Sequence, residues 1–277
     1  MSEQMLSVGE AARRLGVKPV TVQRWVDAGN LSALRTIGGH RRIPATEVRR
    51  LLADNRSVSE SGQVSFWIDQ LFEANAAAIC EAMRRARRRK GSWYAVVEEI
   101  VAAVSEIGAM WEAGECHIYQ EHAATEALKR AIHSCLAKHT DKADLGLTVL
   151  FTVPGERHSV GLSLAQLVVA DAGLDILWLG EGPPEGELAL LVDDRRPDLL
   201  VTSCSGSSPR AVVEPYEDAL LSVAKTQKIQ LILAGAGPWS EQSRANRVES
   251  FAEFHDALGK LGAAKRTKEG KTKRRAK

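Results

Sequence analysis

The chain has 277 residues, which is enough for two or three domains with a sizeable core. Its 37 Lys and Arg residues nearly balance 35 Asp and Glu residues, so the local distribution of charge is more informative than the formal net charge of +2. No apolar stretch approaches the roughly 20 residues that a bilayer-spanning helix needs, and the first residues lack the apolar segment of a signal peptide. We therefore expect a soluble, cytoplasmic protein with no membrane partner.

The four cysteines argue against a cross-linked scaffold. They lie far apart, at positions 80, 116, 135 and 204, and no two of them form a Cys-x-x-Cys pair. This usage favours reduced thiols over a disulfide framework or a zinc site.

Residues 1–54 have the pattern of a small DNA-binding fold. Ser7 and Glu10 have the spacing of a capping box at the start of a short helix, and Pro19 suits the first turn of a second helix. Two short helices joined by a tight turn are typical of a helix-turn-helix. The segment "LRTIGGHRRI" then predicts two strand arms around a two-residue turn at Gly38-Gly39, which would form the wing of a winged helix.

Polar side chains gather on the second helix and on the wing. Donors of these kinds read base edges and hold phosphates in DNA. The expected DNA-binding residues are Thr21, Gln23, Arg24, His40, Arg41 and Arg42. The alternative is a winged helix used for protein contacts, with the arginines of the wing simply solvated.

The order of helices, hairpin, basic wing and closing helix resembles the DNA-binding domain of MerR-type transcription regulators. The stretches "SVGEAARRLGVKPVTVQRWVDAGNL" and "RTIGGHRRI" carry this resemblance, which covers residues 5–52. It implies a double-stranded DNA operator as partner. It also implies binding as a homo-oligomer, a dimer or tetramer, because one unit this small contacts too few bases for useful discrimination.

A polar, Ser-rich stretch at 55–63 predicts a linker that lets the DNA-binding domain orient separately. Apolar residues at helical spacing over 64–140 then predict a four-helix bundle. Within it, Trp111, Glu121 and His122 share one face if a single helix carries all three, since 11 residues at about 100° each bring His122 to within roughly 20° of Trp111. The alternative is a buried Trp beside a Glu-His pair with no binding role.

Residues 145–262 alternate short apolar strands with amphipathic helices. Strands such as "LTVLFTV", with no polar alternation, suit a parallel sheet covered on both faces. Helical crossovers between them predict a doubly wound, flavodoxin-like α/β domain whose ligand crevice lies at the carboxyl ends of the strands. The strongly basic residues 263–277 predict a disordered tail that can touch phosphate.

The loop "PGERHSVG" follows the first strand of this α/β domain. Polar side chains at such a strand end point into the ligand crevice, and a neutral imidazole is a strong metal ligand. A carboxylate two residues away can orient that imidazole. His158 is therefore a candidate metal ligand and Glu156 its candidate support, although a lone His on a loop is more often structural.

The spacing after that loop resembles the cobalamin-binding domain, whose pattern is Asp-x-His-x-x-Gly, then Ser-x-Leu, then Gly-Gly at similar intervals. Here 41 residues separate Gly161 from Ser203, and 28 separate Ser205 from Ala234. The matching positions are Glu156, His158, Gly161, Ser203, Ser205, Ala234 and Gly235. The resemblance implies His158 as lower axial ligand of cobalt, Glu156 as its support, and a channel of small residues for the displaced nucleotide tail. Ala in place of the first Gly would narrow that channel by one methyl group.

Together, the three regions resemble CarH-type adenosylcobalamin photoreceptor repressors over residues 5–260. The resemblance implies adenosylcobalamin, with its cobalt ion, as cofactor, and places Trp111, Glu121 and His122 around the adenosyl group. It also implies a repressor whose oligomeric state and DNA affinity change when light removes that group. In the light-sensing family a His follows the motif Trp, whereas this chain has Glu112.

Two other functions remain in view. A light-independent regulator of the same family would respond to cobalamin, another tetrapyrrole or an antirepressor protein, and Glu112 favours it. A corrinoid carrier subunit of a methyltransferase also joins a helical bundle to this α/β domain, but it lacks a winged helix. No nucleophile beside a base and no paired carboxylates stand out in the crevice, so we expect a protein that is not an enzyme and has no catalytic residues.

Overall fold

The computed structural model describes residues 5–15, 19–27, 31–35, 41–137, 146–243 and 245–261. The chain divides into two compact units, Met1–Phe66 and Trp67–Lys277, and each is described by itself. None of the described helices is both long enough and apolar enough to span a membrane. The basic tail expected at 263–277 lies outside the described residues.

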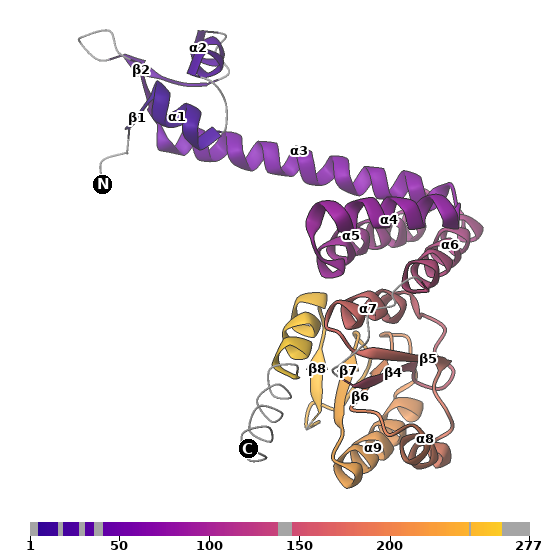
Figure 1. Ribbon diagram of the computed structural model, residues 1–277. Helices are drawn as coiled ribbons and strands as arrows, with labels where there is room; N and C mark the ends of the chain where they lie inside the picture. Colours follow the sequence, from indigo (N-terminus) through magenta and orange to yellow (C-terminus); the bar gives the residue numbers. More distant parts are fainter. Residues whose placement is uncertain are drawn as a thin grey trace, which may run out of the picture. The chain divides into compact units, whose positions relative to one another are not determined.

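The first unit contains two short helices and a three-stranded antiparallel sheet (Figure 1). Its elements are β1 (Met5–Ser7), α1 (Val8–Leu15), α2 (Pro19–Asp27), β2 (Leu34–Arg35) and β3 (Arg41–Pro44), followed by the start of α3. The predicted capping box is present, since the Glu10 N–H donates to Ser7 Oγ at 3.2 Å and the Ser7 N–H donates to the Glu10 carboxylate at 2.8 Å. Leu6, Val22 and Ile43 lie in the core of this unit.

The wing hairpin pairs in a register that differs from the expected one. An uninterrupted ladder around a two-residue turn at Gly38-Gly39 requires Arg35 opposite Arg42, whereas Arg35 lies opposite Arg41. A one-residue change of register moves every side chain of an arm to the other face. Arg41, and not Arg42, therefore lies on the same face of the sheet as Arg35. The connecting residues 36–40 lie outside the described part of the chain.

Helix α3 runs unbroken from Ala45 to Phe72. The stretch 55–63, which we expected to be an irregular linker, is part of this helix. The expectation was wrong about local structure, because the stretch contains no Pro, and Ser and Gly lower helix stability by only about 1 kcal/mol or less per residue. The boundary between the two units falls near the end of this helix.

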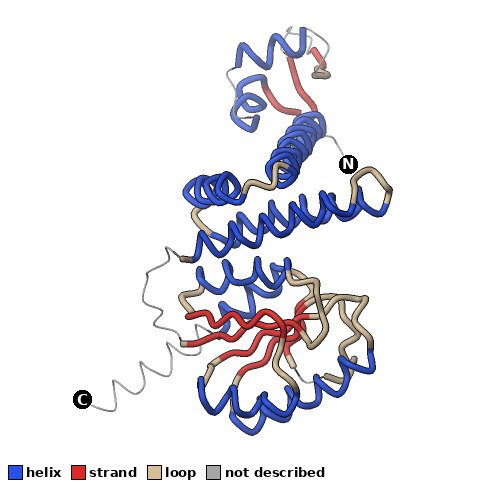
Figure 2. Tube along the Cα trace, turned by 90° about the vertical axis from the view of Figure 1, so that its right-hand side faces the viewer, coloured by secondary structure: helices blue, strands red, loops and turns tan. Residues whose placement is uncertain are grey.

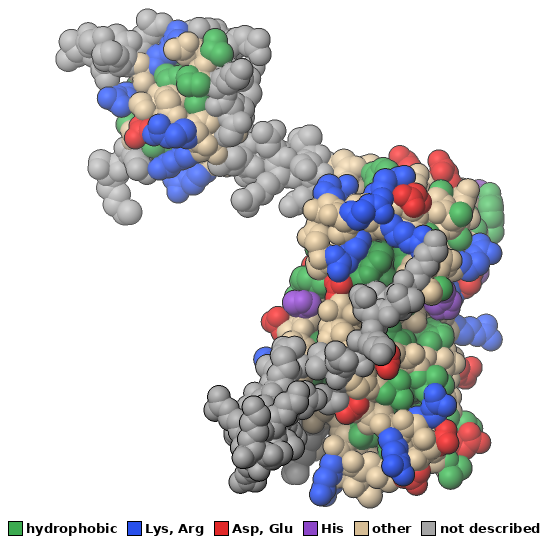
Figure 3. Space-filling model, in the orientation of Figure 1, with side chains coloured by type: hydrophobic (Ala, Val, Ile, Leu, Met, Phe, Trp, Pro, Cys, Tyr) green, Lys and Arg blue, Asp and Glu red, His purple; other side chains and the backbone are tan. Residues whose placement is uncertain are grey.

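The second unit begins with a helical region. It contains the end of α3 together with α4 (Ala76–Lys90), α5 (Trp93–Glu112) and α6 (Ile118–Leu136). Its core is built from large apolar side chains at helical spacing: Trp67, Leu71, Ile79, Met83, Ile100, Ile107, Leu128 and Ile132. The last turn of α4 is basic, where cations suit the helix dipole, and Lys and Arg side chains gather on this part of the surface (Figure 3).

The rest of the second unit is a five-stranded parallel sheet covered by helices on both faces (Figures 1 and 2). The strands are β4 (Leu147–Thr152), β5 (Asp175–Glu181), β6 (Leu199–Ser203), β7 (Gln230–Ala234) and β8 (Asn246–Val248), in the order β5-β4-β6-β7-β8. Between them lie α7 (Val160–Asp171), η1 (Glu185–Glu187), α8 (Leu188–Arg195) and α9 (Arg210–Gln227), and residues 251–261 are also helical.

This arrangement is the predicted doubly wound α/β domain. Because β4 is followed by β5 on one side and has β6 on its other side, the topological switch point lies at the carboxyl ends of β4 and β6. The sheet order also brings the ends of β7 and β8 to the same edge. The loop that carries His158 follows β4 and therefore lies at that switch point.

The helical region is fastened to the α/β domain at the end of α7. The Asp171 carboxylate accepts hydrogen bonds from the backbone N–H groups of Trp93 and Tyr94 at the start of α5, and from the Arg87 guanidinium at 2.9 Å. The Tyr94 ring also stacks on His255, with the ring centres 4.4 Å apart. Helices α5 and α6 both pack against α7.

Candidate functional site

A buried carboxylate forms the centre of the candidate site. Glu156, in the loop after β4, is only 9 % exposed. Its Oε1 accepts the backbone N–H of His158 at 2.6 Å and lies 2.7 Å from His158 Nδ1. Its Oε2 accepts the Ser205 N–H at 2.8 Å, the Ser205 hydroxyl at 2.6 Å and the Ser208 hydroxyl at 2.5 Å. The carboxylate thus joins the loops that follow β4 and β6.

These hydrogen bonds keep the carboxyl ionised. Burial raises the pKa of Glu156, but the hydrogen bonds from Ser205, from Ser208 and from the backbone N–H of His158 outweigh it and bring the pKa to about 2, against an ordinary value of 4.5. An ionised carboxylate can only accept hydrogen bonds, so the Nδ1 that faces it carries the proton. In the neutral imidazole the lone pair of His158 is then on Nε2.

His158 presents that lone pair to the surroundings. Its side chain is 72 % exposed, although its Nδ1 is fixed by Glu156. A carboxylate on one ring nitrogen fixes the orientation and increases the basicity of the other, which is how metal-binding histidines are commonly supported. One imidazole of this kind suits a metal ion that arrives with its other ligands in place.

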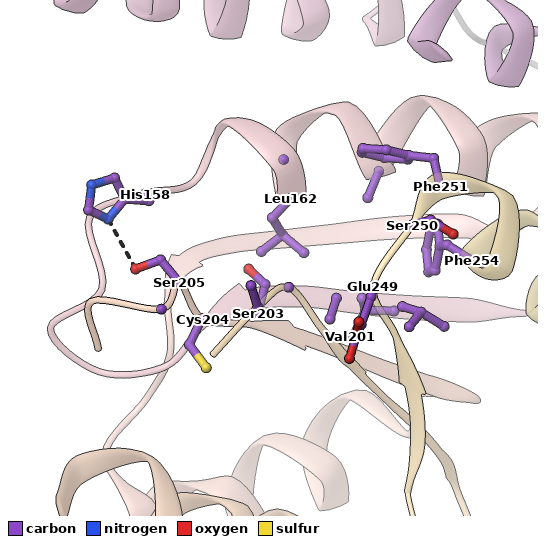
Figure 4. Close-up of a pocket in the computed structure, with 17 residues that line it drawn as sticks. His158, Leu162, Val201, Ser203, Cys204, Ser205, Glu249, Ser250, Phe251 and Phe254 are labelled. Atoms are coloured by element: carbon purple, nitrogen blue, oxygen red, sulfur yellow. Dashed lines mark hydrogen bonds between the residues drawn. The ribbon is translucent and has the colours of Figure 1, made fainter. Parts of the chain in front are cut away.

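One cavity opens beside His158 and has a volume of about 320 Å³ (Figure 4). It runs over the carboxyl ends of β6 and β7, under α7, toward the helix at 251–261. Five further residues singled out from the sequence line it: Gly161, Ser203, Ser205, Ala234 and Gly235. Gly235 has φ +85° and an added Cβ would lie 2.5 Å from the Cys204 carbonyl oxygen, so this position requires glycine.

The second cavity lies between the helical region and the α/β domain and has a volume of about 690 Å³. Trp111, Glu121 and His122 line it from α5 and α6, and His158 lines it from the other side. The His122 Nδ1 lies 2.6 Å from the Glu121 carboxylate. His158 therefore borders both cavities.

Trp111 and His122 come from two different helices, whereas the sequence analysis placed them on one. α5 ends at Glu112, Gly114 adopts φ +75°, and α6 begins at Ile118, so no single helix carries Trp111 and His122. The interruption follows from Gly114, because a left-handed backbone ends a helix. Trp111 is 46 % exposed, which excludes the alternative of a buried Trp. Glu112 also lines this cavity.

The expected DNA-binding residues are described only in part. Gln23 is exposed on α2, and Arg41 and Arg42 are partly exposed on β3. Thr21 and Arg24 lie on α2, but their side chains are outside the described structure, as is the whole of His40.

Sequence reasoning missed three residues of the site. Ser208 donates to Glu156, and Phe251 and Phe254 line the smaller cavity. Ser208 stands at the end of the run of small residues "SCSGSS", which predicts only packing around a nucleotide tail. The spacing of three between the two phenylalanines, after a Ser that can cap a helix, was the available signal.

Comparisons with known proteins identify two domains in this chain. Residues 5–56 match the sequence model of the helix-turn-helix domain, and residues 67–135 match that of the B12 binding domain. The chain combines a helix-turn-helix domain with a B12-binding domain. The match to the B12-binding domain covers the helices that form one wall of the larger cavity.

Relatives cover either most of this chain or somewhat more than half of it. The HTH-type transcriptional repressor CarH of Myxococcus xanthus is 25% identical, over 90% of this chain and 94% of its own length. The trimethylamine corrinoid protein of Methanosarcina barkeri is 22% identical, over 59% of this chain and 77% of its own length. The structure of the monomethylamine corrinoid protein of Methanosarcina barkeri superposes with a TM-score of 0.53 at 20% identity, covering 70% of this chain and 95% of that one, which shows a shared fold.

Proposed function

We propose that this chain is a transcription regulator whose DNA binding is controlled by a bound cobalamin, with His158 as the lower axial ligand of the cobalt ion. The observation that carries the proposal is the carboxylate-held imidazole of His158, which borders a smaller cavity on one side and a larger one on the other. A corrin ring over His158 would face the helical region, and its displaced nucleotide tail would enter the smaller cavity. Glu156 holds the Nδ1 proton and so keeps Nε2 available for cobalt.

The cofactor proposed is adenosylcobalamin, which supplies a cobalt–carbon bond that light can break. Trp111, Glu121 and His122 would surround the adenosyl group, since they line the larger cavity opposite His158. Occupation of this cavity would favour one arrangement of α5 and α6 against α7, and the cofactor need only bind that arrangement better than others. If α5 and α6 move relative to α7, the hydrogen bonds of Asp171 would keep the start of α5 attached to the end of α7.

The helix-turn-helix domain would bind a double-stranded DNA operator through Gln23, Arg41 and Arg42, together with Thr21, Arg24 and His40. The proposed role is that of a repressor acting as a homo-oligomer, a dimer or tetramer. Several linked reading domains bind an operator far more tightly than one, so a cofactor that changes the assembly changes the DNA affinity.

A second function, regulation without light, is favoured by Glu112. In this chain a carboxylate lines the larger cavity next to Trp111, where the light-sensing family has an imidazole. A regulator with this residue would respond to cobalamin itself, to another tetrapyrrole or to an antirepressor protein. A corrinoid carrier of a methyltransferase is disfavoured because residues 5–56 match the helix-turn-helix domain.

The test is to add adenosylcobalamin to the full chain in the dark and to record the absorption spectrum and the molar mass before and after green light. Wild-type protein is expected to bind the cofactor with a shifted cobalt absorption, because an imidazole replaces the cofactor's own base. His158→Ala should lose this shift. His255→Ala is the matched control, since that imidazole stacks on Tyr94 and lines neither cavity.

Three outcomes separate the possibilities. A change of mass on illumination supports the light-dependent form. Binding without a change of mass on illumination favours the light-independent form. No uptake of cobalamin contradicts the proposal and leaves a DNA-binding regulator with another trigger.

A further inference from the structure

The smaller cavity has two chemically different ends. Figure 4 shows His158 and Ser205 at one end, Phe251 and Phe254 at the other, and Ser203 between them. The walls toward the phenylalanine end consist of buried apolar side chains from α7, β6, β8 and the helix at 251–261. These are Leu162, Ala165, Val201, Val248 and Phe254.

The polar groups around this cavity mostly have partners of their own. The Ser205 hydroxyl donates to Glu156 at 2.6 Å. Ser250 Oγ accepts the N–H of Glu253 at 3.2 Å, and the exposed Glu249 carboxylate pairs with Arg247 at 3.4 Å. Apart from the hydroxyls of Ser203 and Ser250 and the exposed Glu249 carboxylate, the walls therefore offer an occupant apolar contact.

The backbone of the wall is paired in the same way. The Gly235 N–H donates to the Val248 carbonyl at 3.2 Å, and the Ala234 carbonyl accepts from the Trp239 indole at 3.2 Å. Ser203 contributes a hydroxyl midway along the cavity, which can meet one polar group of an occupant.

We propose that this cavity selects corrinoids by the base of their nucleotide tail, accepting an apolar benzimidazole and discriminating against adenine. The inference rests on the proposed function, since the tail enters the cavity only when His158 has displaced it from the metal. A benzimidazole ring presents apolar edges that match Leu162, Val201 and Phe254. Adenine carries an exocyclic amine and additional ring nitrogens, and in this cavity most of them would lose water without gaining a partner.

The expected size of the discrimination follows from that loss. Each buried polar group left without a partner weakens binding by about tenfold, so the adenine corrinoid should bind about 10- to 100-fold more weakly. Cobinamide, which has no nucleotide, should also bind more weakly than the benzimidazole corrinoid, because it buries nothing in the cavity.

The experiment measures dissociation constants of the full chain for cobalamin, for its adenine analogue and for cobinamide, by absorption titration in the dark. It is repeated with Val201→Thr, which places a hydroxyl in the apolar wall at nearly constant volume. Val149→Thr is the matched control, because Val149 is a fully buried strand valine that packs in the core cluster on the opposite face of the sheet. Ala165→Ser on α7 serves if Val201→Thr does not fold.

The inference is supported if wild type prefers the benzimidazole corrinoid by about tenfold or more. Val201→Thr or Ala165→Ser should then reduce this preference by about threefold or more, and Val149→Thr should leave it unchanged. Equal affinity of wild type for the two bases overturns the inference and leaves the proposed function intact. Selectivity that both valine variants alter equally also overturns it, because the effect would then come from the stability of the domain. Failure of every corrinoid to bind refutes the proposed function and the inference with it.

Discussion

The carboxylate of Glu156 should make the stability of this protein depend on pH in a way that one substitution removes. A carboxyl whose pKa is 4.5 when unfolded and about 2 when folded contributes about 3 kcal/mol to the free energy of unfolding at neutral pH. The pKa is lowered by folding, so this contribution is complete above the unfolded pKa and is lost as the pH falls through the folded one. At pH 3 only about 1 kcal/mol of it remains.

Glu156→Gln has nearly the same shape but no charge, and it should remove this contribution. Urea unfolding of both proteins, followed by circular dichroism at pH 7, 5, 4 and 3, gives the difference in free energy of unfolding at each pH. We expect a difference of about 3 kcal/mol at pH 7 and 5 that shrinks toward about 1 kcal/mol at pH 3. Ser208→Ala, which removes one donor to the same carboxylate, should give a smaller difference with the same trend.

A difference between wild type and Glu156→Gln that stays constant from pH 7 to pH 3 would refute this reasoning. It would mean that the cost of the substitution arises from shape and packing, and that the serine hydroxyls do not stabilise the negative charge. The Nδ1 of His158 would then have no electrostatic reason to carry the proton.

Three further predictions concern other parts of the molecule. Arg41→Ala should weaken DNA binding across sequences and lower the slope of log affinity against log salt by about 1, measured by fluorescence anisotropy, and wild-type binding that ignored salt would contradict a phosphate contact. Asp171→Ala should lower the free energy of unfolding by about 3 kcal/mol, because it leaves a guanidinium and two helix N–H groups without their acceptor, and a loss below about 1 kcal/mol in urea unfolding would count against that fastening. Gly235→Ala should destabilise more than Gly155→Ala in thermal unfolding, since both have positive φ but only the first crowds the Cys204 carbonyl oxygen, and equal losses would show that backbone strain alone decides.

The sequence predicts the α/β part of the site well because parallel sheets obey a strong rule. The loop of Glu156 and His158 follows β4, and Ser205 follows β6, so neighbouring strands bring them to one edge although 41 residues separate Gly161 from Ser203. The capping box of α1 was likewise predictable from the sequence, since Ser7 and Glu10 interact over one turn. In each case a local pattern and a general rule of geometry suffice.

The remaining features depend on packing between segments. Trp111 and His122 meet because α5 and α6 fold back against each other after Gly114, a turn whose direction no periodicity encodes. The phenylalanine end of the smaller cavity depends on β8, a strand of three residues with the sequence "NRV" that is too short and too polar to be recognised alone. The binding motif therefore predicts where a metal would be held, whereas the segments that the motif does not include determine what else the site accepts. For this reason the selectivity of the site for the nucleotide base should vary with Val248 and Phe254 even where Glu156 and His158 are unchanged.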